Sequence, residues 1–254
     1  MKPLLITIDG PAGAGKTTVS RALADRLGYT YVDTGALYRG VAREMKVRQV
    51  DPEDEKGLAR VLGDLDLRFV RRDRDLRLLS AGVDITGEIR NPEITMLASA
   101  ASAKPEVRSA LLALQRRLGA EKSAVFEGRD MGTVVFPDAD VKFFLIADLH
   151  VRARRRYLEL AGDPGLSLEQ VEKDMQKRDA NDAGRSIAPL KAADDAVYID
   201  STSRDATAVV DEMIRQGHRP QLQSGVQASD PRQILRHMRG EAAARGAFVK
   251  GGVA

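Results

Sequence analysis

The sequence predicts an α/β protein in which helices cover both faces of a parallel β-sheet. Three observations support this fold class. Five short apolar runs recur along the chain, and helical patterns lie between most of them. The runs are continuous rather than alternating, which is typical of strands buried on both faces. The first run leads directly into a glycine-rich turn, and a helical pattern follows at once.

The apolar runs are the expected strands, at residues 4–9, 29–33, 124–127, 141–147 and 196–200. Helices are expected after four of these strands, at residues 16–27, 36–45, 149–160 and 205–216. The last helical pattern stops before Gly217, a residue type that often follows a helix C-terminus. This order of strands and helices predicts a doubly wound sheet.

Residues 65–118 interrupt the alternation of strands and helices. They contain three short strand patterns separated by turn signals, at residues 65–70, 76–80 and 83–85, which predict a small antiparallel sheet inserted in the core. Two helices are expected next, at residues 92–103 and 105–118, and each begins with a proline. Proline is well tolerated there, because the first N–H groups of a helix have no partner within it.

Residues 161–191 form a second interruption, which is polar and charged. Gly162, Pro164 and Gly165 break one helical pattern before Ser167 begins another. Two readings remain open for this segment. It is a charged helical arm over a binding site, or a solvent-exposed hairpin without a function.

The tail that begins at Gly217 carries six Lys or Arg residues against two acidic ones, so its net charge is +4. The whole chain has a net charge of +3, which leaves −1 for residues 1–216. Charge therefore gives no reason to expect a nucleic-acid partner for the body of the chain. For the tail, a flexible extension and a basic tether to RNA or to a partner protein both remain possible.

Composition excludes several classes of protein. Hydrophobic residues make up 43% of the chain and charged residues 30%, which is ordinary for a folded domain and not for a disordered one. No apolar stretch approaches the roughly 18 residues of a membrane helix, and a cytoplasmic location is the default expectation. The chain has no cysteine, which excludes disulfides and thiolate metal sites. Its three histidines show no metal-ligand spacing and are expected at the surface.

The segment GPAGAGKT at residues 10–17 matches the pattern G-x-x-x-x-G-K-S/T, between an expected strand and an expected helix. Glycines let several backbone N–H groups point at one anion, and the helix N-terminus adds a partial positive charge. Lys16 is expected to reach the β- and γ-phosphates of a nucleotide, and the Thr17 hydroxyl to bind Mg²⁺. The motif predicts nucleotide binding but leaves the reaction open.

Charged residues follow two further expected strands. Asp33 and Arg39 follow the second, and Glu127 and Arg129 follow the third. Ligands of open α/β sheets bind beyond the carboxyl ends of the strands, so these side chains are expected beside the phosphate loop. The arginines are candidates for binding a second phosphate group, and the carboxylates for holding Mg²⁺-bound waters. The alternative is that the arginines pair with acidic groups at the surface.

Five motifs, in this order, resemble those of the bacterial cytidylate kinase family: GPAGAGKTT, DTGALYR, ITGEIRNPEI, GRDMGTVVFPDA and KRDANDAGRSIAPL. The likeness covers about residues 3–216. It implies a P-loop NTPase core with a five-stranded parallel sheet, an inserted antiparallel-sheet domain for the nucleoside monophosphate (NMP), and a mobile helical lid. The core would comprise residues 1–64, 119–160 and 186–216, the insert about 65–118 and the lid about 161–185. The implied reaction converts ATP and CMP to ADP and CDP, with dCMP also accepted, Mg²⁺ required and a monomer expected.

The resemblance also implies roles for individual residues. The phosphate loop would bind ATP through Gly10, Pro11, Ala12, Gly13, Ala14, Gly15, Lys16, Thr17 and Thr18. The phosphate-facing, catalytic group would comprise Lys16, Arg129, Arg155 and Arg185. Mg²⁺ would be held by Thr17 directly, and by Asp33 and Glu127 through water. The family commonly has Asp where Glu127 stands, which lengthens that arm by one methylene.

The CMP site implied by the resemblance has three parts. Thr34, Tyr38 and Arg39 would lie near the acceptor phosphate, Ser99, Arg108 and Asp130 at the cytosine, and Arg178 and Asp182 at the sugar hydroxyls. Cytosine chemistry agrees, because Asp130 can accept a hydrogen bond from the exocyclic amine, whereas uracil presents a carbonyl there. A mismatch of this kind discriminates strongly when it is buried.

Two arginine-rich patterns allow alternatives. Arg178, Asp182 and Arg185 are spaced to share one face of a helix, which suits a ligand site or a solvated salt-bridge ladder. In the run at residues 152–156, Arg152, Arg155 and Arg156 share a helical face that could close over the transferring phosphoryl group. The sequence does not say which of the four arginines, Arg154 included, makes that contact. The run contains no aromatic residues that would favour a nucleic-acid patch instead.

Other functions remain possible at this stage. One is a P-loop kinase for another small acceptor, such as uridylate, adenylate or shikimate. Another is a nucleotide-dependent switch that hydrolyses ATP or GTP slowly and engages RNA through its tail, although the chain lacks the N-K-x-D motif of guanine-selective switches. A third is an enzyme whose tail has a separate binding function.

Overall fold

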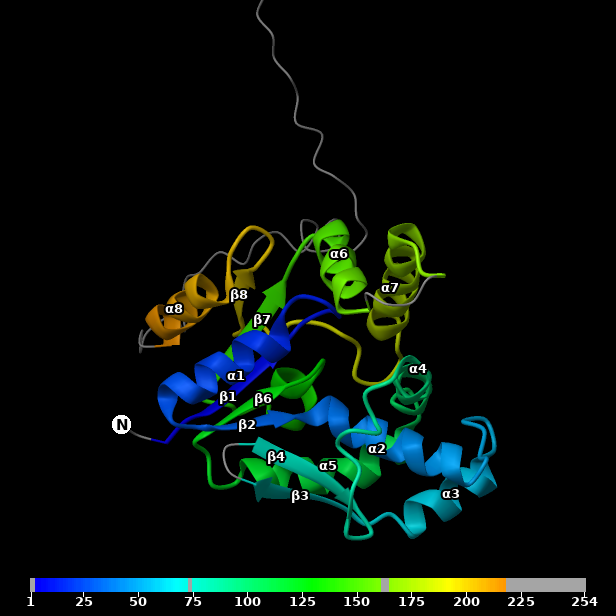
Figure 1. Ribbon diagram of the computed structural model, residues 1–254. Helices are drawn as coiled ribbons and strands as arrows, with labels where there is room; N and C mark the ends of the chain where they lie inside the picture. The colour runs from blue at the N-terminus through cyan, green and yellow to red at the C-terminus, as the bar shows by residue number, and fades with distance from the viewer. Residues whose placement is uncertain (1–2, 73–74, 161–164, 218–254) are drawn as a thin grey trace, which may run out of the picture.

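The computed structural model describes residues 3–72, 75–160 and 165–217 (Figure 1). A five-stranded sheet has the order β2-β6-β1-β7-β8, and all its neighbouring strands are parallel. The strands are β1 (Leu5–Asp9), β2 (Thr30–Asp33), β6 (Ala124–Glu127), β7 (Val141–Ile146) and β8 (Val197–Asp200). Each lies within one residue of the expected limits, and the predicted fold class is confirmed.

Helices cover both faces of this sheet because side chains of each strand point alternately to the two sides. On one face, α1 (Lys16–Leu27) packs beside α8 (Ala206–Gly217) over buried strand residues that include Ile8 and Leu145. On the other face, Leu5 and Phe126 pack with Met131 and Phe136, which lie beyond the end of β6. The order of the strands brings the carboxyl ends of β1, β2 and β6 together at one edge.

The insert has the expected antiparallel sheet, with strands β3 (Leu67–Arg72), β4 (Asp75–Ser80) and β5 (Val83–Asp84). The two helices that begin with proline follow as α4 (Pro92–Ala101) and α5 (Pro105–Gly119). All of these pack with α2 (Thr34–Val47), which is longer than expected at both ends, around a shared apolar cluster that includes Leu37, Leu78 and Leu111.

The short helix α3 (Glu55–Gly63) was not predicted. Its apolar face is small, because only Leu58 and Val61 are its buried large side chains, and such a pattern is difficult to distinguish from a loop. The Asp54 side chain caps it by accepting a hydrogen bond from the N–H of Gly57. Both buried side chains join the core of the insert.

The charged segment contains the helix α7 (Leu168–Ala183), which packs against α6 (Leu149–Glu159), the helix expected at residues 149–160. Their contact is a small apolar cluster of Leu149, Ala153, Val171 and Met175, with Ala12 of the phosphate loop packed against it. The helix α7 begins after Ser167, as expected, and ends before Gly184. The expectation that Arg185 shares a helical face with Arg178 and Asp182 is therefore wrong, because Arg185 lies beyond the end of the helix.

Several expectations lie outside the described residues. These are the helix-breaking Gly162 and Pro164, the tail from residue 218 onward, and His218 and His237. The remaining histidine, His150, is exposed as expected and lies 3.0 Å from a carboxylate oxygen of Glu172. Within residues 3–72, 75–160 and 165–217, none of the helices has the length and apolar character needed to cross a membrane.

Candidate active site

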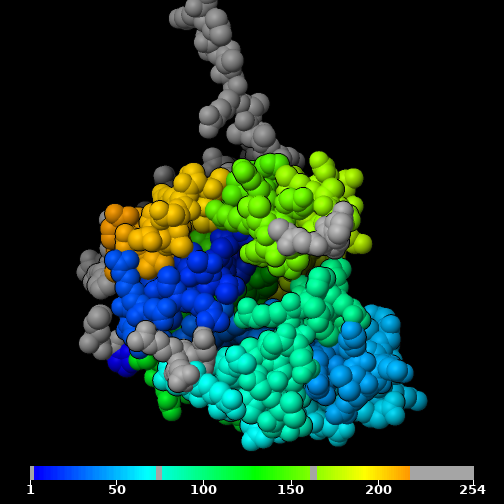
Figure 2. All heavy atoms as spheres, in the orientation of Figure 1, coloured from blue at the N-terminus to red at the C-terminus, as the bar shows by residue number. Residues whose placement is uncertain are grey.

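A cavity of about 770 Å³ opens where the carboxyl ends of β1, β2 and β6 meet. In Figure 2 the surface is hollowed between the part that carries α6 and α7 and the insert that carries α4. The cavity brings together the site residues expected from the sequence, except Gly10 and Pro11. Those that line it are Ala12, Gly13, Ala14, Gly15, Lys16, Thr17, Thr18, Asp33, Thr34, Tyr38, Arg39, Ser99, Arg108, Glu127, Arg129, Asp130, Arg155, Arg178, Asp182 and Arg185.

The phosphate loop depends on its glycines. Gly13 and Gly15 have φ angles of +73° and +87°, in the left-handed region that other residues rarely adopt. At Gly10 a Cβ atom would lie 2.1 Å from the carbonyl oxygen of Leu145, so β7 leaves no room for a side chain. The loop therefore wraps tightly in front of α1, whose N-terminus is open for an anion.

Lys16 is buried in this loop, and its Nζ donates a hydrogen bond of 2.6 Å to the carbonyl oxygen of Pro11. Burial, together with the nearby positive charge of Arg129, lowers the pKa of Lys16 from its ordinary value to about 7. The loop thus holds an ammonium group whose charge is not fully compensated by its neighbours. Phosphate groups of a nucleotide would supply the missing negative charge.

Glu127, at the end of β6, accepts hydrogen bonds from Thr17 Oγ1 (2.8 Å) and from the hydroxyl group of Tyr31 (2.6 Å). The Thr34 hydroxyl donates a hydrogen bond of 2.7 Å to the backbone carbonyl oxygen of Glu127. These contacts join the first turn of α1, strand β2 and the start of α2 at one point. They also place a threonine hydroxyl and a carboxylate side by side, which are oxygen donors of the kind that Mg²⁺ prefers.

Asp33 and Arg39, for which the sequence suggested separate roles, form an ion pair of 2.6 Å inside the cavity. Asp33 also caps α2 by accepting a hydrogen bond from the N–H of Ala36. Arg90, which was not predicted as a site residue, lies 3.6 Å from the same carboxylate. Arg39 thus pairs with an acidic group, but the pair lines the cavity and is mostly buried, so the alternative of pairing at the surface is wrong for Arg39.

The base-reading residues expected from the sequence line the same cavity as the phosphate loop. Arg108 is ion-paired with Asp130, and both side chains are buried. A second guanidinium nitrogen of Arg108 donates to the carbonyl oxygen of Ser102 at 3.2 Å, and its guanidinium carbon lies 5.6 Å from the centre of the Tyr38 ring. Burial raises the pKa of Asp130, and Arg108 opposes this change. Ser99 lines the same part of the cavity.

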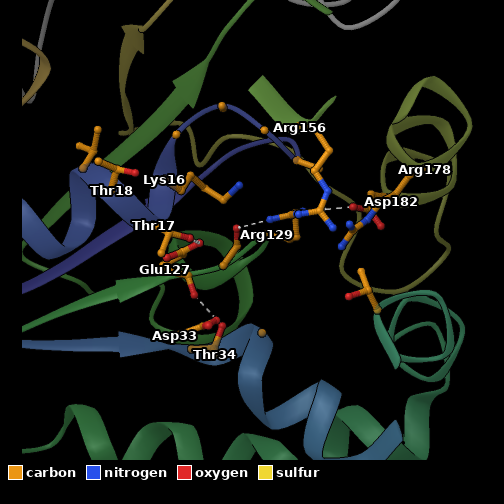
Figure 3. Close-up of a pocket in the computed structure, with 18 of the residues that line it drawn as sticks. Lys16, Thr17, Thr18, Asp33, Thr34, Glu127, Arg129, Arg156, Arg178 and Asp182 are labelled. Carbon is orange, nitrogen blue, oxygen red and sulfur yellow. Dashed lines mark hydrogen bonds and ion pairs between the residues drawn. The ribbon is translucent and has the colours of Figure 1, made fainter. Parts of the chain in front are cut away.

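Three arginines surround one carboxylate on the α7 side. Asp182 accepts from Arg129 Nε at 3.1 Å and from Arg185 Nη2 at 2.5 Å. Burial alone would raise the pKa of Asp182, but Arg129 and Arg185 hold it below its ordinary value. Burial and the charge of Arg129 lower the pKa of Arg178 to about 10. In Figure 3, Arg129 lies between the phosphate-loop residues and the α7 residues Arg178 and Asp182. The alternative of a solvent-exposed salt-bridge ladder is wrong for these residues, because Asp182 is only 2% exposed.

The arginines of α6 have different surroundings. Arg155 donates to Ser201 Oγ (3.2 Å) and to the Ser201 carbonyl oxygen (2.6 Å), and Arg156 pairs with Glu159 at 3.0 Å. Arg155 and Arg156 both line the cavity. The expectation that Arg152 faces the phosphates as well is wrong, because its side chain is fully buried and does not line the cavity.

Other residues of the site gave no signal in the sequence. Ser201, Arg204, Asp205, Ala206 and Val209, from the end of β8 and the start of α8, line the cavity beside the phosphate loop. The available clue was that these residues follow the expected strand at residues 196–200, since ligands bind beyond the carboxyl ends of parallel strands.

Asp9 was also missed as a residue of the site. Its two carboxylate oxygens accept from the N–H groups of Met131 (2.9 Å) and Gly132 (2.8 Å). These N–H groups belong to the first turn of a π-helix, η1 (Met131–Val135), which was not predicted and which begins directly after Asp130. Asp9 therefore joins β1 to the segment that carries Arg129 and Asp130.

The phosphate loop between a buried strand and a helix is typical of P-loop kinases, and here a second cluster of arginines lines the same cavity. The model of the family described as cytidylate kinase matches residues 6–219, and the chain belongs to this family. It is accordingly an enzyme, a nucleoside monophosphate kinase.

Curated relatives agree with this assignment. A protein named cytidylate kinase from Geobacter sulfurreducens is 49% identical over 83% of this chain and 91% of its own length. Another from Syntrophotalea carbinolica is 46% identical over 84% of this chain and 92% of its own length. A bifunctional pantoate ligase/cytidylate kinase from Synechococcus is 45% identical over 83% of this chain, which corresponds to 42% of that longer protein. Among solved structures, a shikimate kinase from Acinetobacter baumannii is similar with a TM-score of 0.40 and 16% identity, covering 85% of this chain and 93% of that one.

Proposed function

We propose that this enzyme transfers the γ-phosphoryl group of ATP to CMP, giving ADP and CDP, and that it also accepts dCMP. The observation that carries the proposal is the buried Arg108–Asp130 pair, which lines the same cavity as the phosphate loop. The names of the relatives support CMP as the acceptor. The motif resemblance supports dCMP and a monomer.

The base would be selected by complementary hydrogen bonding. Asp130 offers a carboxylate oxygen to the exocyclic amine of cytosine, while Arg108 and Ser99 offer donors to its ring nitrogen and carbonyl oxygen. With uracil, the carbonyl oxygen at the amine position would face the Asp130 carboxylate, and neither group has a proton to share. Because Asp130 is 2% exposed, water could not easily relieve this mismatch.

The residues present also fit a Mg²⁺ ion. Thr17 Oγ1 would bind it directly, and Glu127 and Asp33 would hold its waters, which agrees with the contact between Thr17 and Glu127. The described residues contain no cluster of three or more His, Cys, Asp or Glu side chains suited to a metal, so the remaining ligands would be phosphate oxygens and water. When bound, the ion neutralises negative charge on the transferring phosphates.

The reaction requires positioning more than covalent chemistry by the protein. An oxygen of the CMP phosphate forms a bond to the γ-phosphorus, and the bond from that phosphorus to the bridging oxygen breaks, so that ADP leaves with the electron pair. Lys16 and Arg129 would hold the ATP phosphates, and Arg39 and Arg185 the acceptor phosphate. Arg155, next to Ser201, would approach the ATP from α6.

The first test measures ADP release from Mg·ATP with CMP, dCMP, UMP, AMP, GMP, shikimate or no acceptor. We expect strong stimulation by CMP and dCMP, and little by the others. The variant Asp130→Asn should lower the ratio of kcat/KM for CMP to that for UMP by about tenfold or more, since its amide can donate to the uracil carbonyl. Equal stimulation by UMP in the wild type would contradict the base-reading hypothesis. ADP release that ignores the acceptor would instead favour a nucleotide-hydrolysing switch.

A further inference from the structure

Arg152 has the largest fully buried side chain among the described residues, and its guanidinium group joins three parts of the molecule. Its Nε donates to the carbonyl oxygen of Ala147 (2.9 Å), beyond the end of β7. Its Nη1 donates to the carbonyl oxygen of Ala12 in the phosphate loop (3.0 Å) and to Asp179 Oδ2 in α7 (2.6 Å). Neither Arg152 nor Asp179 lines the cavity, so this ion pair lies behind the ligand site.

The phosphate loop packs tightly against this ion pair and against the two helices. A Cβ atom at Gly13 would lie 2.7 Å from Met175 Cε and 3.0 Å from Arg152 Cβ. Ala12 packs on the apolar cluster between α6 and α7. A displacement of α7 would therefore be transmitted to the rear of the loop that holds the ATP phosphates.

Asp179 lies on α7 between residues that face the ligand. Arg178 precedes it directly, and Asp182 follows within one helical turn, and both line the cavity. Because an α-helix is rigid over such a distance, the position of Asp179 sets the positions of both neighbours. The ion pair between Asp179 and Arg152 thus helps to fix where the sugar-binding side chains stand relative to the phosphate loop.

Stability alone is a poor explanation for this pair. Arg152 Nη2 and Asp179 Oδ1 are buried and have no hydrogen-bond partner among the described residues, and burial raises the pKa of Asp179. A buried ion pair can often be replaced by apolar side chains without loss of stability, whereas removing one partner is costly. An incompletely satisfied buried pair calls for another explanation, such as the fixing of a geometry.

We propose that the Arg152–Asp179 pair is a positioning device, which holds Arg178 and Asp182 at a fixed place relative to the phosphate loop and so couples the binding of the two nucleotides. This inference rests on the proposed function, because it takes ATP and CMP as the ligands. It predicts that a bound ATP analogue strengthens CMP binding, and that the strengthening passes through this pair.

The test uses the double variant Arg152→Met/Asp179→Leu, which removes both charges and fills the space with apolar side chains, and the single variant Asp179→Asn. The dissociation constant of CMP is measured by calorimetry with and without a non-hydrolysable ATP analogue, and kcat and both KM values are measured by ADP release. We expect both variants to lose most of the coupling and to lose about tenfold or more in kcat/KM for CMP. The dissociation constant of the ATP analogue in the absence of CMP, measured in the same way, should change less than about threefold. A purely structural role would lower kcat through a smaller folded fraction and leave the KM for CMP and the coupling unchanged.

The matched control is the exposed pair Arg26–Asp211, which joins α1 to α8 at 2.5 Å. The variant Arg26→Met/Asp211→Leu should keep all the binding and kinetic constants. If the double variant at residues 152 and 179 does not fold, Asp179→Asn decides the outcome. The inference would be overturned if the folded variants kept the full coupling of the wild type. It would also be overturned if the wild-type enzyme phosphorylated CMP but showed no coupling between the two nucleotides. Failure of the proposed function is a different result, in which the wild type neither binds nor phosphorylates CMP.

Discussion

Lys16 carries a charge that the folded protein disfavours, and this has a consequence for binding. Burial and Arg129 lower its pKa to about 7, so the free enzyme at pH 8 holds Lys16 mostly neutral. The phosphates of Mg·ATP would raise this pKa again, since they bring negative charge to the ammonium group. We expect binding to take up about one proton at pH 8 and almost none at pH 6, where Lys16 is already charged.

Calorimetry of Mg·ATP binding in two buffers with different ionisation enthalpies measures this proton uptake. The observed binding enthalpy should depend on the buffer at pH 8 and hardly at all at pH 6. The variant Lys16→Met serves as the control, because it has no amine to titrate. Identical enthalpies in both buffers at pH 8 would show that Lys16 keeps its proton in the free enzyme.

At the scale of single residues, the sequence identified most side chains that line the cavity. Local motifs were sufficient for some of these, because the glycine pattern and the strand ends determine where residues such as Lys16, Asp33 and Glu127 stand. Others, such as Ser99 and Arg108, were expected only from the family resemblance. The surroundings of Arg152 could not be predicted in this way. Its partners Ala12 and Asp179 are 140 and 27 positions away in the sequence, so a helical face alone suggested the wrong direction. Asp9 was missed for the same reason, with partners 122 and 123 positions away.

At the scale of elements, the strands and long helices followed from periodicity, whereas α3 and the π-helix η1 did not. The π-helix is wider than an α-helix and is rarely stable by its own sequence. Here its first N–H groups are capped by Asp9, a residue of β1, which no local pattern reveals. The position of Asp130 in the site thus depends on a contact between two elements.

This contact predicts a pH-dependent stability. Burial raises the pKa of Asp9 from 3.8 to about 6 against the opposing hydrogen bonds from Gly132 and Met131. Because the folded state holds this proton more tightly than the unfolded chain, its contribution to stability is complete below pH 3.8 and is lost as the pH rises through 6. Between pH 5 and pH 8, the free energy of unfolding of the wild type should fall by about 1.4 kcal/mol relative to that of Asp9→Asn, which has no carboxyl group to titrate.

Urea unfolding of both proteins at pH 5, 6, 7 and 8 measures the difference. Other carboxyl groups are common to the two proteins, so their titration cancels in the comparison. A difference that stays constant across this range would mean that Asp9 remains ionised throughout. At pH 6, about 0.4 kcal/mol of the difference of about 1.4 kcal/mol should remain.

At the scale of the whole molecule, the described site is built from the core, the insert and the α6–α7 pair without the basic tail. The residues that line the cavity lie between Ala12 and Val209. The helix α8 is anchored by Val209, Val210 and Met213, all before residue 217. The family match ends at residue 219. We therefore predict that a chain ending at Gly217 keeps kcat and both KM values within about twofold of the full-length values.

The measurement compares ADP release by the full-length and the shortened chain at equal concentrations, with thermal unfolding of both to show that α8 remains folded. A tenfold loss of kcat/KM with an unchanged unfolding temperature would give the tail a catalytic role, against the prediction.

Binding of both chains to a single-stranded RNA is measured alongside, at low and high salt. Binding of RNA to a basic protein segment weakens as the salt concentration rises, because it depends on the release of counterions from the RNA. RNA binding that weakens in this way, and that only the full-length chain shows, would indicate that the tail, with its net charge of +4, contacts the nucleic acid. If both chains have equal kinetic constants and neither binds RNA, the residues that line the cavity are sufficient for catalysis. This agrees with their positions in the sequence, which all precede the tail.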